Sequence, residues 1–208
     1  MVVNHVNIVE VPTIFTRLLD CPITPISKVE NATNPLLAPF FQAFQVVYIR
    51  RGEVNQTAFR KAQEALDRGR VLVVYPEGTR SANGRLGKGR AGMTLLAMRS
   101  GAPILPLVHW GCEKTWDNIR HLRRTDFHIA VGNPFRIKPV AGALSKDLRQ
   151  PLTDAVMYQM AALMPPEYRG EYSDLSQARE DLLLFDEGMP SNLTRRYEIT
   201  GGKPSAAE

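Results

Sequence analysis

The sequence predicts an α/β fold in which a largely parallel sheet is flanked by helices within a single domain. Short apolar runs alternate along the chain with segments of helical periodicity. Several of these runs are apolar at consecutive positions, which is typical of strands that are covered on both faces. The alternation of strands and helices favours parallel strands joined by crossover helices.

Six segments are predicted to be strands because they are short, apolar and bounded by polar or turn-forming residues. The predicted strands are 1–3, 23–28, 46–50, 71–75, 104–109 and 127–131.

Helical periodicity predicts three helices between these strands. In the first, Ala58, Ala62 and Leu66 form part of an apolar stripe and charged residues face away from it. Gly69 and Gly101 are suitable stops for the first two helices, and a pair of prolines ends the third. The predicted helices are 54–68, 91–100 and 147–163.

The composition changes after the third helix. Residues 1–165 are predicted to form the folded domain, whereas polar, acidic and small residues dominate 166–208, where we predict a partly disordered tail. The uncharged stretch 31–49 contains asparagine, glutamine and proline residues that a lipid-exposed helix does not tolerate easily. We therefore interpret this stretch as buried secondary structure and not as a membrane span.

The charge balance is mildly basic, with 26 basic and 21 acidic residues and a formal net charge of +5. This excess suits an anionic partner such as a lipid headgroup or a phosphate. Nucleic acid is not expected, because basic and aromatic residues are not interleaved as stacking platforms require. The two cysteines, Cys21 and Cys112, follow no disulfide or metal-ligand spacing, so a reducing compartment and no metal site are expected.

The first candidate site is a histidine followed five residues later by a glutamate, His5 and Glu10. On one helix they would lie about 140° apart and would not meet. They can meet if His5 lies in a loop after the first strand and a helix begins near Pro12. A histidine oriented by a carboxylate is a base that can activate a hydroxyl.

The second candidate site is Tyr-Pro-Glu-Gly-Thr-Arg-Ser at 75–81, directly after a predicted strand. The carboxyl ends of strands are where α/β folds place ligands. Gly78 allows the backbone to approach a ligand closely, and Arg80 offers a planar donor set that suits phosphate. Thr79 adds a hydroxyl donor.

Other features support narrower interpretations. The Gly-x-Gly-x-x-Gly at 87–92 is separated from the preceding strand by residues 76–86, so a dinucleotide site is not expected, although a basic loop before a helix can bind an anion. His109, in an apolar strand, is interpreted as a satisfied core residue. A phenylalanine group is interpreted as core, with an acyl channel or bilayer contact as the alternative: Phe40, Phe41 and Phe44.

Taken in order, these motifs resemble a known family. Asn-His-x4-acid, Tyr-Ile-x-Arg-Gly, Tyr-Pro-Glu-Gly-Thr-Arg-Ser and Ala-Pro-Ile-Leu-Pro-Leu follow one another along the chain. This set resembles the 1-acyl-glycerol-3-phosphate acyltransferase (lysophosphatidic acid acyltransferase) family, over residues 3 to 165.

The resemblance implies roles for individual residues. It makes His5 the catalytic base and Glu10 the acid that orients it. It links 103–106 to the acyl donor. The residues it assigns to the acceptor are Arg51, Glu77, Gly78, Thr79 and Arg80. In two respects the chain departs from the family. The usual acid of the first motif is aspartate, and the family usually has an apolar segment before this motif, so either the sequence starts within a longer protein or the chain attaches peripherally to a membrane, as expected here.

The resemblance also implies a reaction. An acyl group would move from acyl-CoA or acyl-carrier protein to the free hydroxyl of 1-acyl-glycerol-3-phosphate, giving phosphatidic acid for phospholipid biosynthesis, with the thioester as co-substrate and no other cofactor. The expected partners are a lysophospholipid, an acyl thioester and a membrane surface, at the cytoplasmic inner face. The alternatives are another phosphate-bearing or lysolipid acceptor, or an inactive module that binds lipid phosphate.

Overall fold

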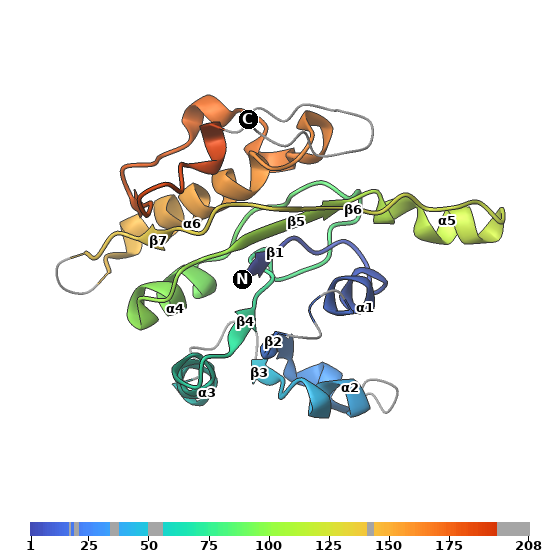
Figure 1. Cartoon of the computed structure of the whole chain (residues 1–208), viewed down its shortest axis with the longest axis horizontal. Coiled ribbons are helices and arrows are strands. Elements are labelled where there is room, and N and C mark those ends of the chain that lie inside the picture. The colour runs from blue at the N-terminus through green and yellow to red at the C-terminus, as the bar shows by residue number, and fades with distance from the viewer. Residues whose placement is uncertain (17, 19–20, 34–37, 50–55, 141–143, 195–208) are drawn as a thin grey trace.

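A mostly parallel sheet, built from two three-stranded parts, organises the described part of the molecule. In the computed structural model, which describes residues 1–16, 18, 21–33, 38–49, 56–140 and 144–194, the strands lie in the order β3-β2-β4 and β1-β5-β6 (Figure 1). A parallel bridge between Val2 and Val74 joins the two halves. Only the pairing of β5 with β6 is antiparallel in this sheet. The strands are β1 (Val2–Val3), β2 (Ile23–Lys28), β3 (Val47–Ile49), β4 (Val71–Val73), β5 (Pro106–Trp110) and β6 (His128–Val131).

Among the described residues, six α-helices accompany the sheet, and the structure confirms the α/β prediction. The three helices expected from the sequence are α3, α4 and α6, each within two residues of its predicted bounds. Three shorter helices were not predicted as such, except that one was expected to begin near Pro12. The helices are α1 (Glu10–Phe15), α2 (Ala38–Ala43), α3 (Gln56–Asp67), α4 (Gly92–Ser100), α5 (Thr115–Arg120) and α6 (Lys146–Ala161).

Both faces of the sheet are covered, which explains why its strands are apolar at consecutive positions. Neighbouring strand residues point to opposite faces and therefore join different hydrophobic clusters. In β5, Leu107 packs in the cluster that contains Phe15 of α1, whereas Val108 packs in the cluster that contains Val156 of α6. The inner strands are consequently buried on both sides.

Residues 166–194 belong to the domain, which corrects the expectation of a tail from residue 166. Strand β8 (Leu183–Leu184) pairs with β7 (Arg136–Ile137), and Tyr172 is buried in the core around α6. Asn192 accepts and donates hydrogen bonds with Asn133. The anchoring residues are widely spaced among exposed polar ones, so the average composition concealed them. Residues 195–208 lie outside the described part of the chain.

The stretch 31–49 also differs from expectation. No residue of α2 is buried; Phe40 and Phe44 are half-buried and pack on Phe15, so they are partly core. Among the described residues, no helix has the length and apolar character needed to cross a membrane.

The packing of residues 166–172 predicts an effect on stability. Gly170 has a φ of +52°, and a Cβ there would overlap the carbonyl oxygen of Leu86, which accepts a hydrogen bond from Glu171. Gly188 has a φ of +78° but open space around it, so it is the matched control. Left-handed strain should cost each alanine variant about 1–2 kcal/mol, and the overlap should cost Gly170→Ala about 1–3 kcal/mol more.

Urea unfolding of both variants measures this difference. Equal losses in Gly170→Ala and Gly188→Ala would show that residues 166–172 do not pack on the domain as described.

Candidate active site

The site lies where β1 and β4 end side by side, at the carboxyl edge of the sheet. β1 ends at Val3 and leads into His5, and β4 leads into residues 75–81. Because the two strands run parallel and are bridged at Val2 and Val74, both loops leave the sheet in the same direction. This edge is the usual place for a ligand site in an α/β fold.

His5 and Glu10 meet, as the sequence predicted. Nδ1 of His5 is hydrogen-bonded to Oε1 of Glu10, the first residue of α1. The other carboxylate oxygen accepts the backbone N–H groups of Val6 at 2.7 Å and Asn7 at 2.9 Å. These bonds fold the loop between β1 and α1 around the carboxylate, which is fully buried.

The pairing sets the tautomer of His5. A carboxylate accepts only, so Nδ1 of His5 is the donor and carries the proton, which leaves a lone pair on Nε2. Within the described part of the chain, Nε2 makes no hydrogen bond, and 23% of the side chain is exposed. The ring of Tyr75 lies against the imidazole, with 4.3 Å between ring centroids. A histidine that is oriented in this way and partly exposed can act chemically as a general base.

Glu77 holds the two loops together. One of its oxygens accepts the backbone N–H of His5 at 2.9 Å, and the other accepts the N–H of Gly87 at 2.8 Å. Burial raises the pKa of Glu77 to about 7, against the lowering effect of these two bonds. Both oxygens are therefore engaged within the protein, and the side chain is placed to position His5.

Each of the remaining residues of the second motif has its own position. Gly78 has a φ of +65°, and a Cβ there would press on the side chain of Arg90. Thr79 and Arg80 are exposed. The next residue, Ser81, donates its N–H to the carbonyl oxygen of His5 at 2.7 Å. Residues 77 and 81 of this loop thus bind the N–H and the C=O of His5. Arg80, between them in the sequence, is exposed to solvent.

Two further anion-binding sites were expected from the sequence, at Arg51 and in the glycine-rich loop 87–92. Arg51 lies outside the described residues. In the glycine-rich loop, the N–H of Gly87 binds Glu77 and the N–H of Gly89 donates to the hydroxyl of Tyr172 at 3.0 Å. These two amides are used in packing the loop.

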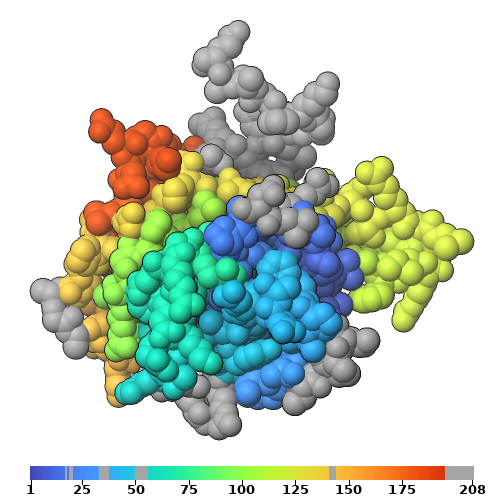
Figure 2. All heavy atoms as spheres, turned by 60° about the horizontal axis from the view of Figure 1, so that its bottom comes forward, coloured from blue at the N-terminus to red at the C-terminus, as the bar shows by residue number. Residues whose placement is uncertain are grey.

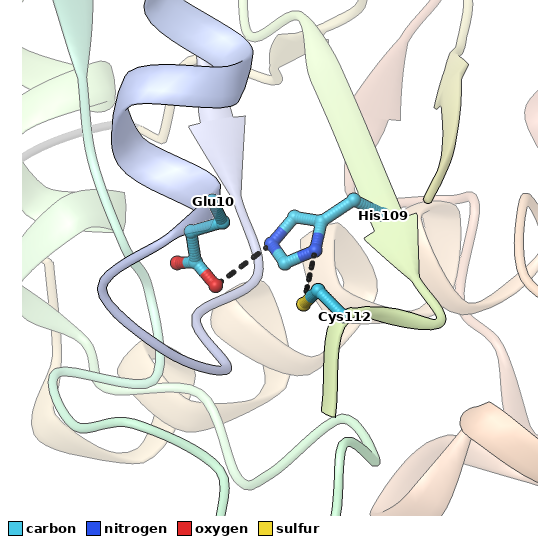
Figure 3. Close-up of side chains that lie close together, drawn as sticks. All are labelled: Glu10, His109 and Cys112. Carbon is cyan, nitrogen blue, oxygen red and sulfur yellow. Dashed lines mark hydrogen bonds and ion pairs between the residues drawn. The ribbon is translucent and has the colours of Figure 1, made fainter. Parts of the chain in front are cut away.

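His109 supports the pair from behind, a role that the sequence did not reveal. It is fully buried and hydrogen-bonded, as expected of a core histidine, but its Nε2 lies 2.8 Å from the carbonyl oxygen of Asn4 and 3.3 Å from Oε2 of Glu10 (Figure 3). Its Nδ1 lies 3.5 Å from the sulfur of Cys112. The one sequence feature that could have indicated this role was the place of His109 at the end of a predicted strand. The structure shows that this strand, β5, pairs with β1.

Hydrogen bonding satisfies this buried group. Burial lowers the pKa of His109, which is therefore neutral, and raises the pKa of the Cys112 thiol to about 12. The thiol donates to Nδ1 and Nε2–H donates toward Asn4 and Glu10. Although Glu10, His109 and Cys112 are close enough to share a metal ion, the carboxylate and the sulfur approach opposite nitrogens of one ring. We interpret the group as a hydrogen-bonded support.

The fold and the histidine–glutamate pair define a class: an α/β protein in which a buried carboxylate orients a histidine at the carboxyl edge of the sheet. The family follows from comparison, because the model of the family described as Acyltransferase matches residues 1–110. The chain belongs to this acyltransferase family, and the resemblance inferred from its motifs is confirmed.

Individual relatives share limited stretches with the chain. It is 40% identical over 50 residues, 24% of the chain and 20% of the relative, to a 1-acyl-sn-glycerol-3-phosphate acyltransferase of Pseudomonas aeruginosa. It is 26% identical over 107 residues, 50% of the chain and 42% of the relative, to the Borreliella burgdorferi protein of the same name. It is 28% identical over 108 residues, 51% of the chain and 41% of the relative, to a lyso-ornithine lipid O-acyltransferase of Pseudomonas aeruginosa. The chain thus spans less than half the length of these relatives.

A solved structure supports the fold. The chain is similar to the 1-acyl-sn-glycerophosphate acyltransferase PlsC of Thermotoga maritima, with a TM-score of 0.51 and 25% identity, over 74% of this chain and 61% of that one.

The raised pKa of Glu77 predicts a pH dependence of stability. The folded state holds this proton up to about pH 7, whereas the unfolded state releases it near pH 4.5. Between these values the unfolded state binds fewer protons, so the contribution of Glu77 to the unfolding free energy falls as pH rises, by at most about 3 kcal/mol. Glu77→Gln does not titrate, so wild type should lose stability relative to this variant between pH 4.5 and 7.5.

Urea unfolding at several pH values gives the difference between the two proteins, in which all other titrating groups cancel. A difference that stays constant with pH would contradict the raised pKa.

Proposed function

We propose that the chain transfers an acyl group from a thioester, acyl-CoA or acyl-carrier protein, to the free hydroxyl of 1-acyl-glycerol-3-phosphate. The observation that supports this best is the partly exposed imidazole of His5, whose Nδ1 is fixed by the buried Glu10. The names of the relatives and of the solved structure support the same acceptor.

In this proposal His5 acts as base and then as acid. Nε2 takes the proton from the acceptor hydroxyl as its oxygen attacks the thioester carbonyl, while Glu10 stabilises the imidazolium. When the C–S bond breaks, the thiolate takes the proton from His5, and the products are the diacyl lipid and a free thiol. General-base assistance of this kind contributes about 10²–10⁴-fold to a rate. No covalent acyl-enzyme is needed.

The acceptor's phosphate would bind Arg80, in the loop that is hydrogen-bonded to the backbone of His5. Arg80 is exposed and adjacent to Ser81, whose N–H binds the backbone of His5. A guanidinium here can hold a phosphate with two parallel hydrogen bonds, and so keep the hydroxyl within reach of Nε2. Thr79 and Arg51 are proposed to assist. The lipid substrate and the net charge of +5 favour work at an anionic membrane surface, on its cytoplasmic side.

A second candidate function is acyl transfer to a different lysolipid. One relative is named a lyso-ornithine lipid O-acyltransferase, which favours a lysolipid other than 1-acyl-glycerol-3-phosphate as the alternative acceptor. Profiling of purified acceptors separates the two. Binding of lysophosphatidic acid without any turnover would instead indicate a module that only binds lipid phosphate.

Replacement of His5 tests the base. We expect His5→Ala to lower acceptor-dependent thiol release from acyl-CoA by about 10²-fold or more, because no other group takes the proton, while binding of lysophosphatidic acid persists. The matched control is His128→Ala, since His128 is an exposed histidine of β6 that takes no part in the proposed mechanism. Full activity in His5→Ala would exclude the proposed mechanism.

Replacement of Arg80 tests the phosphate contact. Loss of a charge-assisted hydrogen bond pair costs about 1.5–3 kcal/mol, so Arg80→Ala should raise KM for lysophosphatidic acid by about 10- to 100-fold, with kcat and KM for the acyl donor little changed. Arg85→Ala, in the same loop and equally exposed, is the control. If the two variants have the same KM, Arg80 does not bind the acceptor.

A further inference from the structure

The helix α5 and the residues directly after it present an apolar surface that no part of the described chain covers. Trp116, Ile119 and Leu122 are 53%, 55% and 96% exposed, respectively. In α5 only Thr115 is buried. The segment projects beyond the ends of β5 and β6, away from the rest of the molecule, in both views of the structure (Figures 1 and 2).

Leu122 is held in an unfavourable backbone conformation. Its φ is +53°, a left-handed value that a leucine rarely adopts and that glycine adopts without strain. A leucine that is both strained and almost fully exposed contributes nothing to the core. Packing within the molecule therefore does not explain this side chain, which is free to contact a partner.

Basic residues accompany this apolar surface. Arg120, Arg123 and Arg124 flank Leu122 on both sides in the sequence, and all three are exposed. Arg124 lies 3.7 Å from Asp126, whereas Arg120 and Arg123 form no ion pair with the described residues. Apolar side chains that include a tryptophan, next to uncompensated arginines, are the composition that binds the interface of an anionic bilayer.

The same segment is joined to the catalytic loop. The carbonyl oxygen of Cys112 accepts hydrogen bonds from the side chain of Asn7 and from the hydroxyl of Thr115, both at 2.6 Å. Asn7 lies two residues from His5, and Thr115 is the first residue of α5. A surface that settles on the bilayer through α5 is therefore connected to the loop that receives the lipid acceptor.

We propose that Trp116, Ile119 and Leu122, with Arg120, Arg123 and Arg124, form a docking surface that seats the enzyme on an anionic lipid bilayer beside its active site. The proposal rests on the proposed function for the identity of the acceptor, but not for the binding itself. A second copy of the chain is a poorer occupant, because a symmetric contact would bring the same arginines together.

Vesicle binding tests the surface without any turnover. The chain has two tryptophans, and Trp110 is buried, so a blue shift of fluorescence on adding vesicles reports Trp116. We expect this shift, together with co-sedimentation, for phosphatidylcholine vesicles that contain phosphatidylglycerol, and much weaker binding to phosphatidylcholine alone. Binding of equal strength to both would overturn the role of the arginines.

Two sets of substitutions separate the apolar and basic contributions. Serine at Trp116, Ile119 and Leu122 should weaken partition on the order of tenfold for each side chain. Arg120→Gln with Arg123→Gln should weaken it roughly fivefold for each charge, and only with anionic vesicles. The control is Leu184→Ser with Met189→Ser, which removes exposed apolar residues elsewhere.

Leu122→Gly gives a result that a structural role cannot produce. The glycine removes the left-handed strain, so this variant should be no less stable to urea than wild type while binding vesicles more weakly. In thiol release, the docking variants should lose activity on lysophosphatidic acid in vesicles but keep it on a short-chain acceptor dissolved as monomer.

The proposal is wrong if the triple serine variant binds vesicles like wild type, or if it changes the oligomeric state while vesicle binding is unaltered. If vesicle binding behaves as expected but no acceptor supports thiol release, the docking surface stands and the proposed acyl transfer fails.

Discussion

The site depends on the hydrogen bonds made by the buried carboxylate of Glu10. This carboxylate binds Nδ1 of His5 and the N–H groups of Val6 and Asn7, and it lies 3.3 Å from Nε2 of the buried His109. A carboxylate with no exposure is stable only where donors surround it. The loop between β1 and α1 supplies these donors, so one charge fixes both the path of the backbone and the orientation of the base.

The second loop takes its place from the first. Glu77 accepts the N–H of His5, and the N–H of Ser81 donates to the carbonyl oxygen of His5. The backbone of His5 therefore connects the loops that follow β1 and β4. This arrangement requires that β1 and β4 end at the same edge of the sheet. The parallel bridge at Val2 and Val74 ensures that they do.

The sequence predicted the sheet well because its strands are apolar on both faces. It predicted that His5 and Glu10 can meet because a histidine in a loop after a strand, with a helix that begins near Pro12, allows the carboxylate to fold back toward the imidazole. It did not predict the packing of residues 166–194, which depends on a few anchors such as Tyr172, nor the contact of His109 with Glu10. Both depend on pairing between distant segments, which local composition and periodicity do not encode. The surface on α5 was missed because a helix of six residues shows little periodicity.

The glutamate in place of the family's usual aspartate is the feature of the site that most needs a test. In Glu10→Gln the amide oxygen can still accept the N–H groups of the loop, but the amide nitrogen would donate to Nδ1 of His5, which moves the imidazole proton to Nε2 and removes the base. The most direct measurement is acceptor-dependent thiol release from acyl-CoA by wild type, Glu10→Gln and Glu10→Asp, with urea unfolding to confirm that each is folded. We expect a loss of about 10²-fold or more in Glu10→Gln and partial retention of activity in Glu10→Asp. A folded Glu10→Gln protein with the activity of wild type would contradict this expectation.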